Sequence, residues 1–582
     1  MNRDGSANWR LADLASSSSY SQTIHSLFSY LSIMKLKKRY WIFILVVGCV
    51  VFAFTPPADR YFEIAKNLEI FASIYKNTNE LYVDEVSPTK MMHNSLDAML
   101  NSLDPYTNYI SEDQVEDFRT MNTGQYGGIG ALTKVYNKRT VVTMVYESYP
   151  AYKNGLRIGD EVIKMNDIEL SKLSLEEANH LMRGQVGTPV KLSVKRLGTD
   201  KLIELEFKRE KIKISNVPYS GMMANDVGYI QLTEFTNDAG KEVKNALISL
   251  KEKGAKYLIL DLRSNPGGLL NESVNICNIF IAKDKKVVDT KGKIEEFNQT
   301  YETKQAPTDL DIPVVVLINR NSASASEIVA GTLQDYDRAV IVGEKSFGKG
   351  LVQVSKPLPY NALVKYTTAK YYTPSGRCIQ VLDYSHRRPD GSAGPTPDSV
   401  KKEFKTKNGR TVYDGGGVDP DIKLEAKEMA SVTVSLLYNG YIFDFASKYS
   451  FEHKSIAEAR SFSLTDQEYA EFVQWMKGKS YTYTSELENE LAAFEEVAKH
   501  EKYLGELKPH VEQVRARLKD RRKNDLILFK DQIKKLLEEE IASRYYFERG
   551  YVEAGFKYDE EIKKAADLLH NPQQYKKILN NE

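Results

Sequence analysis

Two short stretches of this sequence carry side chains suited to acyl-transfer chemistry. The run SASASE spans residues 322–327, and the run FGKG spans residues 347–350. Ser324 offers a hydroxyl nucleophile, and Lys349 could remove its proton. Lysine acts as a general base only where desolvation or a nearby cation lowers its pKa toward neutrality. The eight histidines, which would be the more usual bases, lie far from Ser324 in the sequence, and none has a motif around it.

The segments around Ser324 predict that it lies at a strand-to-helix turn. Residues 312–320, IPVVVLINR, form an apolar β-branched run typical of a buried strand, and residues 325–335 have helical spacing. Free backbone amides and the positive end of a helix favour negative charge at such a turn, as an oxyanion requires. Ser324 and Glu327 also have the spacing of a capping box, in which the serine only satisfies backbone amides. The two roles are compatible, because a capping position exposes its hydroxyl.

A glycine turn precedes this unit. The residues NPGG, 265–268, follow YLILDLR, 257–263, which reads as another strand. Glycine permits a close approach of the backbone, so the amides near Gly267 and Gly268 could bind a developing oxyanion together with the amide of Ala325. The alternative is a turn that only ends the strand.

The lysine loop has two competing interpretations. A lysine between two glycines is most often a solvated charge. In addition, GEKSFGKG, residues 343–350, nearly fits the phosphate-binding pattern G-x-x-x-x-G-K-[ST]. That pattern fails at Gly350, which has no hydroxyl for a magnesium ion, and the following residues read as a strand where the phosphate loop would open a helix. The sequence therefore disfavours nucleotide binding.

Taken together, the blocks YLILDLRSNPGG, SASASEIVAGTLQD and RAVIVGEKSFGKGLVQ resemble the core of the carboxyl-terminal processing peptidases, a family of tail-specific serine proteases. Their order and spacing are those of the family. The resemblance implies a ClpP/crotonase-like α/β core with Ser324 as nucleophile and Lys349 as general base. It also implies that Gln353 holds the lysine amine and that Asp335 is a candidate supporting acid.

A second module is predicted upstream, over residues 124–214. It reads as short alternating strands with one amphipathic helix, and YGGIGA, YPAYKNGLRIGDEVIKMND and RGQVGTPVKLSVKR resemble a PDZ domain. Such domains add an extended peptide end as a strand and hold its carboxylate in a nest of backbone amides. The resemblance implies that the nest consists of Tyr126, Gly127, Gly128, Ile129 and Gly130. The alternative is that these glycines only make a turn.

The amino-terminal segment predicts export. Residues 35–39 are basic and residues 41–54 form an apolar run without charge, as in a signal peptide. Residues 34–56 are therefore expected to be a signal peptide or a membrane anchor, preceded by a non-structural extension over residues 1–33. Residues 46–49 loosely match a lipoprotein processing box. Each version places the enzyme in the cell envelope, on the periplasmic side of the inner membrane.

The remaining chain divides by composition. Residues 60–121 read as helical and belong with the peptidase, whose core covers residues 215–424. Residues 383–414 are polar and rich in Pro and Gly, which predicts a surface excursion. Residues 425–582 are charged, with apolar side chains at helical spacing. They are expected to pack on themselves or on a second subunit, with Pro509 interrupting the helices.

Bulk composition excludes several classes of protein. The 582 residues support several domains with cores of their own. With 80 basic and 79 acidic residues, the chain has no general attraction for nucleic acid. Cys277 and Cys378 are the one pair that could form an intrachain disulfide outside the apolar segment, and no spacing predicts a metal site.

The sequence therefore predicts a multidomain α/β and α+β protein: a peptidase core, an inserted PDZ domain and a helical carboxyl-terminal extension. The expected activity is that of an exported serine endopeptidase that binds protein C-termini and works through an acyl-enzyme, without cofactor or metal. Membrane association through the apolar segment and self-association through the terminal helices are both compatible with the sequence. The alternative is a PDZ scaffold whose peptidase core has lost activity.

Overall fold

The computed structural model describes residues 58–223, 226–425 and 427–580. The predicted extension and the signal peptide or anchor lie outside these residues. None of the described helices combines the length and apolar character that a membrane span needs. The chain divides into two units, Met1–Ser95 and Leu96–Glu582. The first contains α3 (Ala58–Leu81) and the beginning of α4 (Pro88–Asn101), and the second contains everything discussed below.

The second unit is built on a six-stranded sheet in the order β10-β11-β12-β15-β16-β23. The edge strand β10 is antiparallel to β11, and all other neighbours are parallel. The strands are β10 (Tyr219–Met222), β11 (Val227–Gln231), β12 (Tyr257–Asp261), β15 (Val314–Ile318), β16 (Ala339–Gly343) and β23 (Ile422–Lys423). Parallel strands are covered on both faces, which explains their near-continuous apolar sequences.

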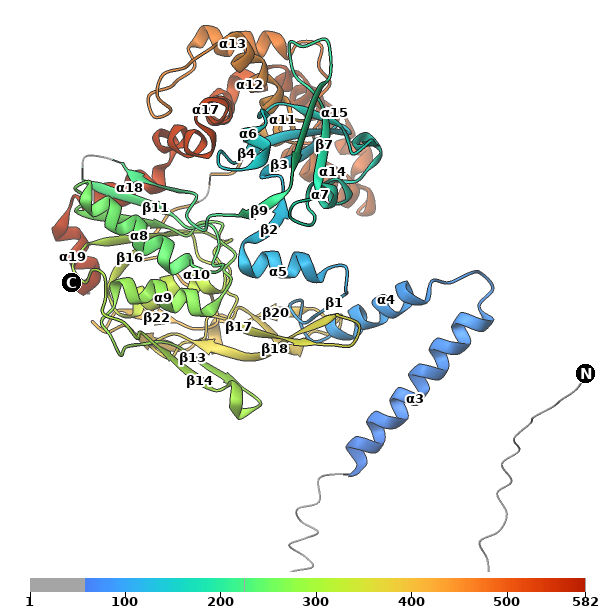
Figure 1. Cartoon of the computed structure of the whole chain (residues 1–582), viewed down its shortest axis with the longest axis vertical. Helices are drawn as coiled ribbons and strands as arrows, with labels where there is room; N and C mark the ends of the chain where they lie inside the picture. The colour runs from blue at the N-terminus through green and yellow to red at the C-terminus, as the bar shows by residue number, and fades with distance from the viewer. Residues whose placement is uncertain (1–57, 224–225, 426, 581–582) are drawn as a thin grey trace, which may run out of the picture. The chain divides into compact units, whose positions relative to one another are not determined.

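Helices from two distant parts of the sequence cover this sheet (Figure 1). On β15, Val314 and Val316 pack toward one face, and Val315 and Leu317 pack toward the other. The first face carries α8 (Ala239–Glu252), α9 (Leu270–Phe280) and α10 (Ala325–Asp335). The second carries the last two helices of the chain, α18 (Glu560–Leu569) and α19 (Pro572–Asn580). Part of the carboxyl-terminal extension therefore completes the peptidase core.

A second sheet lies beside the catalytic segments. Its order is β1-β18-β13-β14, with β17 also paired to β18. The strands are β1 (Asn108–Ile110), β13 (Lys286–Gly292), β14 (Gln299–Glu302), β17 (Leu351–Pro357) and β18 (Leu363–Tyr372). The β17–β18 hairpin directly follows Lys349, so this sheet holds the chain after the base, while β16 of the six-stranded sheet holds the chain before it.

The inserted domain begins and ends at one ladder, in which β2 (Gln125–Gly128) pairs with β9 (Glu210–Lys213) after helix α5 (Val115–Thr123). Its main sheet has the order β3-β4-β5-β7-β8, with β6 beside β5. In chain order, the strands and α-helices between β2 and β9 are β3 (Ala131–Tyr136), β4 (Arg139–Val145), α6 (Pro150–Lys153), β5 (Glu161–Met165), β6 (Ile168–Glu169), α7 (Leu175–Met182), β7 (Pro189–Lys195) and β8 (Ile203–Lys208). Strand β3 is an edge of this sheet.

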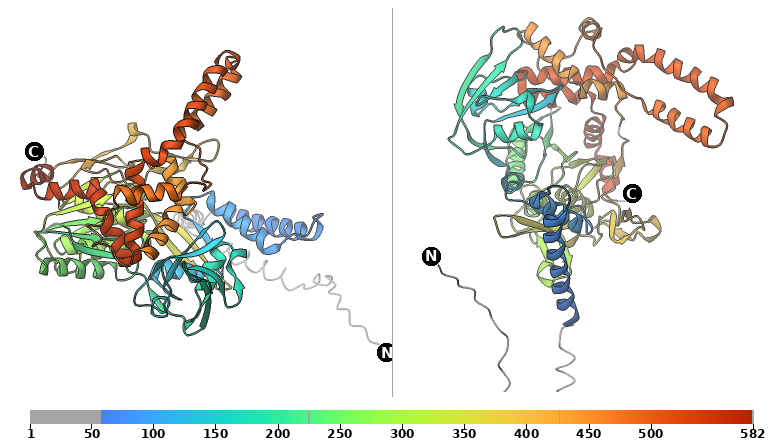
Figure 2. Two further views of the ribbon diagram at one scale, coloured as in Figure 1. Left: turned by 90° about the horizontal axis from the view of Figure 1, so that it is seen from above. Right: turned by 90° about the vertical axis from the view of Figure 1, so that its right-hand side faces the viewer.

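The extension is helical, as predicted. Its other helices are α11 (Ser431–Tyr438), α12 (Tyr441–Glu452), α13 (Asp466–Trp475), α14 (Glu486–His500), α15 (Leu504–Arg521), α16 (Asp525–Leu528) and α17 (Lys530–Gly555). Helices α14 and α15 lie side by side as a hairpin (Figure 2). The expectation that Pro509 interrupts the helices is wrong, because α15 runs through it. Because proline has no backbone N–H, α15 lacks the hydrogen bond that an amide at this position would donate to the Gly505 carbonyl.

The extension also contacts the inserted domain. Arg139 donates two hydrogen bonds to the Asp444 carboxylate, at 2.8 and 3.1 Å. The Tyr136 ring packs against Phe443, with ring centroids 5.7 Å apart. The extension thus contacts both the peptidase core and the inserted domain. Cys277 and Cys378 are free thiols, so the disulfide left open by the sequence does not form.

Candidate active site

Ser324 lies between β15 and α10, as the sequence predicts, and its backbone is strained. Its φ is 56° and its ψ is −113°, a conformation that costs a non-glycine residue free energy and that clusters at functional sites. Its backbone amide donates to Glu327 Oε2 at 2.8 Å, which is the carboxylate half of the predicted capping box. The Ser324 side chain faces the Glu327 backbone amide, which is the other half of that box. Ser324 therefore occupies the capping position that the sequence predicts.

Lys349 lies in the loop between β16 and β17, and its amine is largely withdrawn from solvent. The amine nitrogen is 4.4 Å from the centre of the Tyr106 ring. Burial lowers the pKa of Lys349 to about 8, helped by the positive charge of Lys365 and opposed by the carboxylates of Glu327 and Asp104. A substantial fraction of this amine is therefore neutral near physiological pH, as a general base requires.

Glu327 connects the loops of the serine and the lysine. Its side chain is fully buried. The Oε2 atom that accepts from the Ser324 amide also accepts from the Lys349 amide at 2.9 Å. The other oxygen accepts from the Gly348 amide at 2.7 Å and from Ser346 Oγ at 2.6 Å. Burial raises the pKa of Glu327 to about 7 although these four donors oppose the shift.

Tyr371 makes a second connection between the same loops. Its hydroxyl lies 3.1 Å from the Ser324 carbonyl oxygen and 2.5 Å from that of Lys349, and it is the donor to both. The side chain comes from β18 and is almost completely buried. This role could not be predicted from the sequence, because Tyr371 lies in an ordinary strand pattern. Together, Glu327 and Tyr371 fix the separation of the two backbones.

The NPGG turn packs directly against the serine. A Cβ atom on Gly267 would lie 2.8 Å from both Ser324 Cβ and the Ala325 nitrogen, so no side chain fits there. Gly267 has a φ of 97° and its amide donates to Asn265 Oδ1 at 2.9 Å. This amide is therefore engaged within the turn. The amides of Gly268 and Ala325 make no hydrogen bond within the described residues, which leaves them able to bind an oxyanion.

Two other predicted residues lie away from the amine. Gln353 is on β17, and its side-chain amide donates to Thr367 Oγ1 at 3.3 Å instead of contacting the Lys349 amine. Asp335 ends α10, about 15 Å from Ser324 by the rise of a helix. It forms an ion pair with Arg377 at 2.9 Å, both side chains being almost fully buried. In this structure Asp335 stabilises the fold around the helix rather than contacting the serine or the lysine.

Three side chains near the lysine were not assigned from the sequence: Tyr106, Lys365 and Tyr384. The Tyr106 and Tyr384 rings meet edge to face with centroids 6.4 Å apart. Tyr384 belongs to β19 (Leu382–Arg387), within the segment predicted to be only a surface excursion. That segment, which also contains β20 (Ala393–Pro395), β21 (Glu403–Lys405) and β22 (Thr411–Tyr413), is mostly exposed, but its first strand contributes to the site.

The proposed carboxylate-binding residues lie partly in a strand and partly in the turn that follows it. Tyr126, Gly127 and Gly128 belong to β2, whereas Ile129 and Gly130 lead into β3. The carbonyls of Ile129 and Gly130 accept from the Ala151 and Tyr146 amides, at 2.9 and 3.0 Å. This fixes the turn at the amino end of β3. Because β4 is the one strand paired with β3 in the described sheet, the other edge of β3 is open for strand addition.

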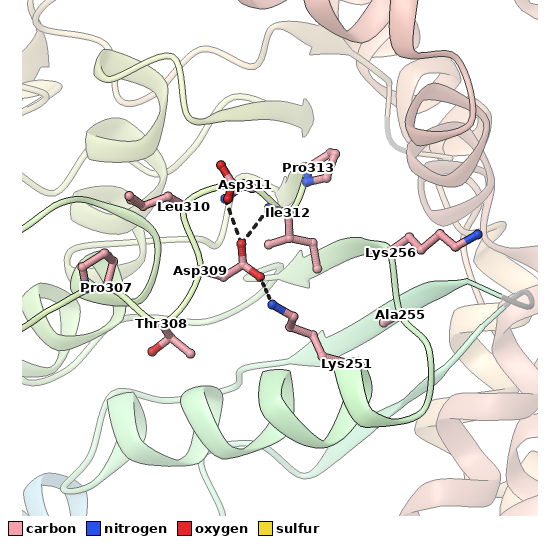
Figure 3. Close-up of a pocket in the computed structure, with 10 residues that line it drawn as sticks. All are labelled: Lys251, Ala255, Lys256, Pro307, Thr308, Asp309, Leu310, Asp311, Ile312 and Pro313. Carbon is pink, nitrogen blue, oxygen red and sulfur yellow. Dashed lines mark hydrogen bonds and ion pairs between the residues drawn. The ribbon is translucent and has the colours of Figure 1, made fainter.

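A separate hollow lies away from this site. It has a volume of about 600 Å³ and is lined by residues 251, 255, 256 and 307–313 (Figure 3). These residues lie at the amino ends of β12 and β15, whereas the Ser324 and Gly267 turns follow the carboxyl ends of those strands. The Asp309 carboxylate pairs with Lys251 and accepts from the Asp311 and Ile312 amides. The Asp309 carboxylate is thus already satisfied.

Comparison with known protein families accounts for most of the second unit. The model described as "Peptidase family S41" matches residues 226–384, and the model described as "PDZ domain" matches residues 127–207. A third, "Probable PDZ-protease, C-terminal helical domain", matches residues 432–569. The carboxy-terminal-processing protease of Bartonella bacilliformis is 36% identical over 342 residues, covering 58% of this chain and 76% of that protein. The chain belongs to peptidase family S41.

The chain is also similar to two further proteins. A probable CtpA-like serine protease of Staphylococcus aureus is 38% identical over 316 residues, which cover 54% of this chain and 62% of that protein. Among solved structures, the photosystem II D1 C-terminal processing protease is 25% identical with a TM-score of 0.32, covering 61% of this chain and 92% of that one. The predicted serine protease class, the PDZ domain and the mixed α/β fold with a helical extension are confirmed.

Proposed function

We propose that this family S41 protein is an exported endopeptidase that cleaves through a Ser324–Lys349 dyad. The observation that carries the proposal is the shared acceptor: a single carboxylate oxygen of Glu327 binds the backbone amides of both residues. This links a serine with a strained backbone to a lysine whose pKa is lowered to about 8. Such a combination has no evident use in a purely structural turn.

The first half of the proposed reaction forms an acyl-enzyme. The neutral Lys349 amine takes the proton of the Ser324 hydroxyl while Oγ bonds to the scissile carbonyl carbon. The amides of Gly268 and Ala325 hold the negative charge that develops on the carbonyl oxygen. The tetrahedral intermediate then collapses, the C–N bond breaks, and the Lys349 ammonium gives its proton to the leaving amine. In the structure the amine lies over the Tyr106 ring, so the Lys349 side chain must reorient toward Ser324 before this step.

The second half releases the acyl group. Water gives a proton to Lys349 and attacks the ester carbon, and the same amides stabilise the second oxyanion. The Ser324–acyl bond breaks, Ser324 recovers its proton from Lys349, and the product leaves as a carboxylic acid that loses its proton to solvent. In this scheme Gly267 shapes the turn, and Gln353 and Asp335 support the surrounding structure.

The PDZ domain supplies the substrate in this proposal. A protein C-terminus adds to the open edge of β3, with its carboxylate at the Gly128–Gly130 turn. Because the carboxylate lies at the amino end of β3, the bound tail runs antiparallel to that strand. Export rests on the basic and apolar residues 35–54, which predict an envelope location with or without an anchor.

The decisive experiment compares Ser324→Ala and Lys349→Met with Lys345→Met, an exposed lysine of the same loop that pairs with Asp419. We expect the first two variants to lose proteolysis of an unfolded protein such as casein while keeping their melting temperature, and the third to remain active. Mass spectrometry of envelope proteins then reads the new chain ends. Full cleavage by either dyad variant would refute the dyad, and an inactive natural sequence would favour the scaffold alternative.

A further inference from the structure

Lys365 lies beside the proposed active site. It is on β18 and is half-buried. Its amine makes no hydrogen bond or close ion pair with any residue that the structure describes, although lysines withdrawn from water are normally paired. Burial lowers the pKa of Lys365, and the Asp104 carboxylate opposes that shift. A second partly buried positive charge beside the general base requires an explanation.

Strand register places Lys365 next to the general base. In the β1–β18 ladder Asn108 stands opposite Lys365, and Tyr106 lies two residues before Asn108. The Tyr106 ring is the surface on which the Lys349 amine rests, 4.4 Å from its centre. The two lysine side chains therefore reach the same region from different elements.

The neighbours of Lys365 on its own strand face also belong to this region. Thr367 lies two residues further along β18, on the same face. Its hydroxyl accepts from Gln353, and its backbone amide donates to Thr107 Oγ1 at 3.1 Å. This part of β18 thus lies beside the segment that precedes β1 and beside β17.

The charged groups around the Lys349 amine act in opposite directions. Glu327 of α10 and Asp104 of the loop before β1 favour the ammonium form, but both carboxylates are already engaged. Glu327 has four donors, and Asp104 accepts from the Tyr106 and Thr107 amides at 2.8 and 2.9 Å. Lys365 of β18 opposes the ammonium form, and it ranks directly after burial among the causes that lower the pKa of Lys349.

Aromatic groups complete this environment. The Tyr106 ring would stabilise an ammonium by a cation–π contact, and Tyr384 of β19 backs that ring. Arg387 lies beyond Tyr384, 5.7 Å from its ring centre. The buried Tyr371 hydroxyl is bound to backbone carbonyls and stays neutral, because burial raises its pKa. A nearby positive charge is therefore needed to offset the contacts that stabilise the ammonium form of Lys349.

We propose that Lys365 supplies this positive charge. Its ammonium disfavours protonation of the neighbouring Lys349 amine and so keeps the base in its neutral, reactive form. It acts through Lys349 and does not contact the substrate in this scheme. The inference rests on the proposed Ser324–Lys349 dyad and adds a second lysine to it. A neighbouring positive charge in a partly buried setting shifts the titration of an amine by about one pH unit.

The test is the pH dependence of kcat/KM in Lys365→Met and Lys365→Arg. A quenched fluorescent peptide without ionisable side chains, ending in a free apolar C-terminus, serves as substrate between pH 6 and pH 10. For Lys365→Met we expect the acid limb to move about one pH unit upward, with activity about ten-fold lower at pH 7 and recovered above pH 9. Lys365→Arg keeps the charge and should restore the original limb.

Lys356→Met is the matched control, because Lys356 is an exposed lysine of β17 in the same hairpin. An unshifted limb in Lys365→Met, or equal losses in the Met and Arg variants at every pH, would overturn the role of Lys365. Thermal melts of all variants separate a charge effect from a folding defect, since misfolding lowers activity without moving the limb. If Lys349→Met stays active, the dyad itself fails; if only Lys365→Met behaves like the control, the dyad stands.

Discussion

At Lys349, burial and neighbouring charge compete for one proton. With its pKa near 8, only the neutral fraction of the amine can act as a base. Since raising the pH produces that neutral fraction, kcat/KM should increase with pH and level off above about pH 9. Between pH 7 and pH 9 the expected gain is about ten-fold. Steady-state assays with a non-titrating peptide check this, and a profile that falls across the same interval would contradict a neutral lysine base.

Glu327 is expected to be as important to activity as the residues that it holds. Glu327→Gln keeps the shape but replaces one acceptor oxygen by an NH2 group that faces donors, which leaves buried groups unpaired at a cost of about 1–3 kcal/mol. We expect a lower melting temperature and a loss of kcat of at least about 100-fold, because the two loops are no longer fixed to each other.

The matched control for this substitution is Glu538→Gln. Glu538 is also fully buried and accepts from the Leu464 amide and from Ser463 Oγ, but it lies in the helical extension. Thermal melts and kcat are measured for both variants. A similar loss of stability with unchanged kcat in Glu538→Gln would assign the Glu327 effect to the site. Equal kcat values in the two variants would remove the positioning role of Glu327.

At the scale of elements, the NPGG turn is defined by how closely it approaches the serine. Gly267→Ala should reduce activity by about 100-fold or more, because its Cβ would collide with Ser324 and Ala325 and displace the neighbouring amides. Gly254→Ala is the control, since Gly254 has the same φ of 97° but open space around it. It should lose only about 1 kcal/mol of stability. Comparable activity losses in the two variants would show that backbone strain, not crowding, is responsible.

The same scale shows what the sequence could and could not predict. The turn at Ser324 was predictable because a β-branched run and a helical pattern meet there. Such local structure depends mainly on residues that are adjacent in the sequence. Tyr371 and Lys365 were not predictable, because their roles depend on the register of β18 against β17 and β1. The role expected for Gln353 also depends on that register, which directs its side chain to Thr367.

At the scale of the whole molecule, the helical extension is part of the peptidase. Ile562, Leu568 and Tyr575 pack against the sheet face opposite α10, and the Tyr575 hydroxyl binds the backbone of Val314 at the start of β15. Arg263, just before the NPGG turn, pairs with Asp559 and Glu561 at the start of α18. The end of the chain thus contacts the strand that leads to Ser324 and the turn that binds the oxyanion in our proposal.

Leu568→Ala tests whether the extension stabilises the catalytic core. Leu568 is buried between α18 and the sheet, so truncating it should cost about 2–5 kcal/mol and lower the melting temperature of the unit that carries Ser324. Proteolytic activity should be lost at the same lowered temperature, because the helix supports the sheet beneath the site. Lys564→Ala, an exposed substitution on the same helix, should change neither property. If Leu568→Ala melts the extension while peptidase activity survives to the original temperature, the extension is an independent domain and the core is complete without it.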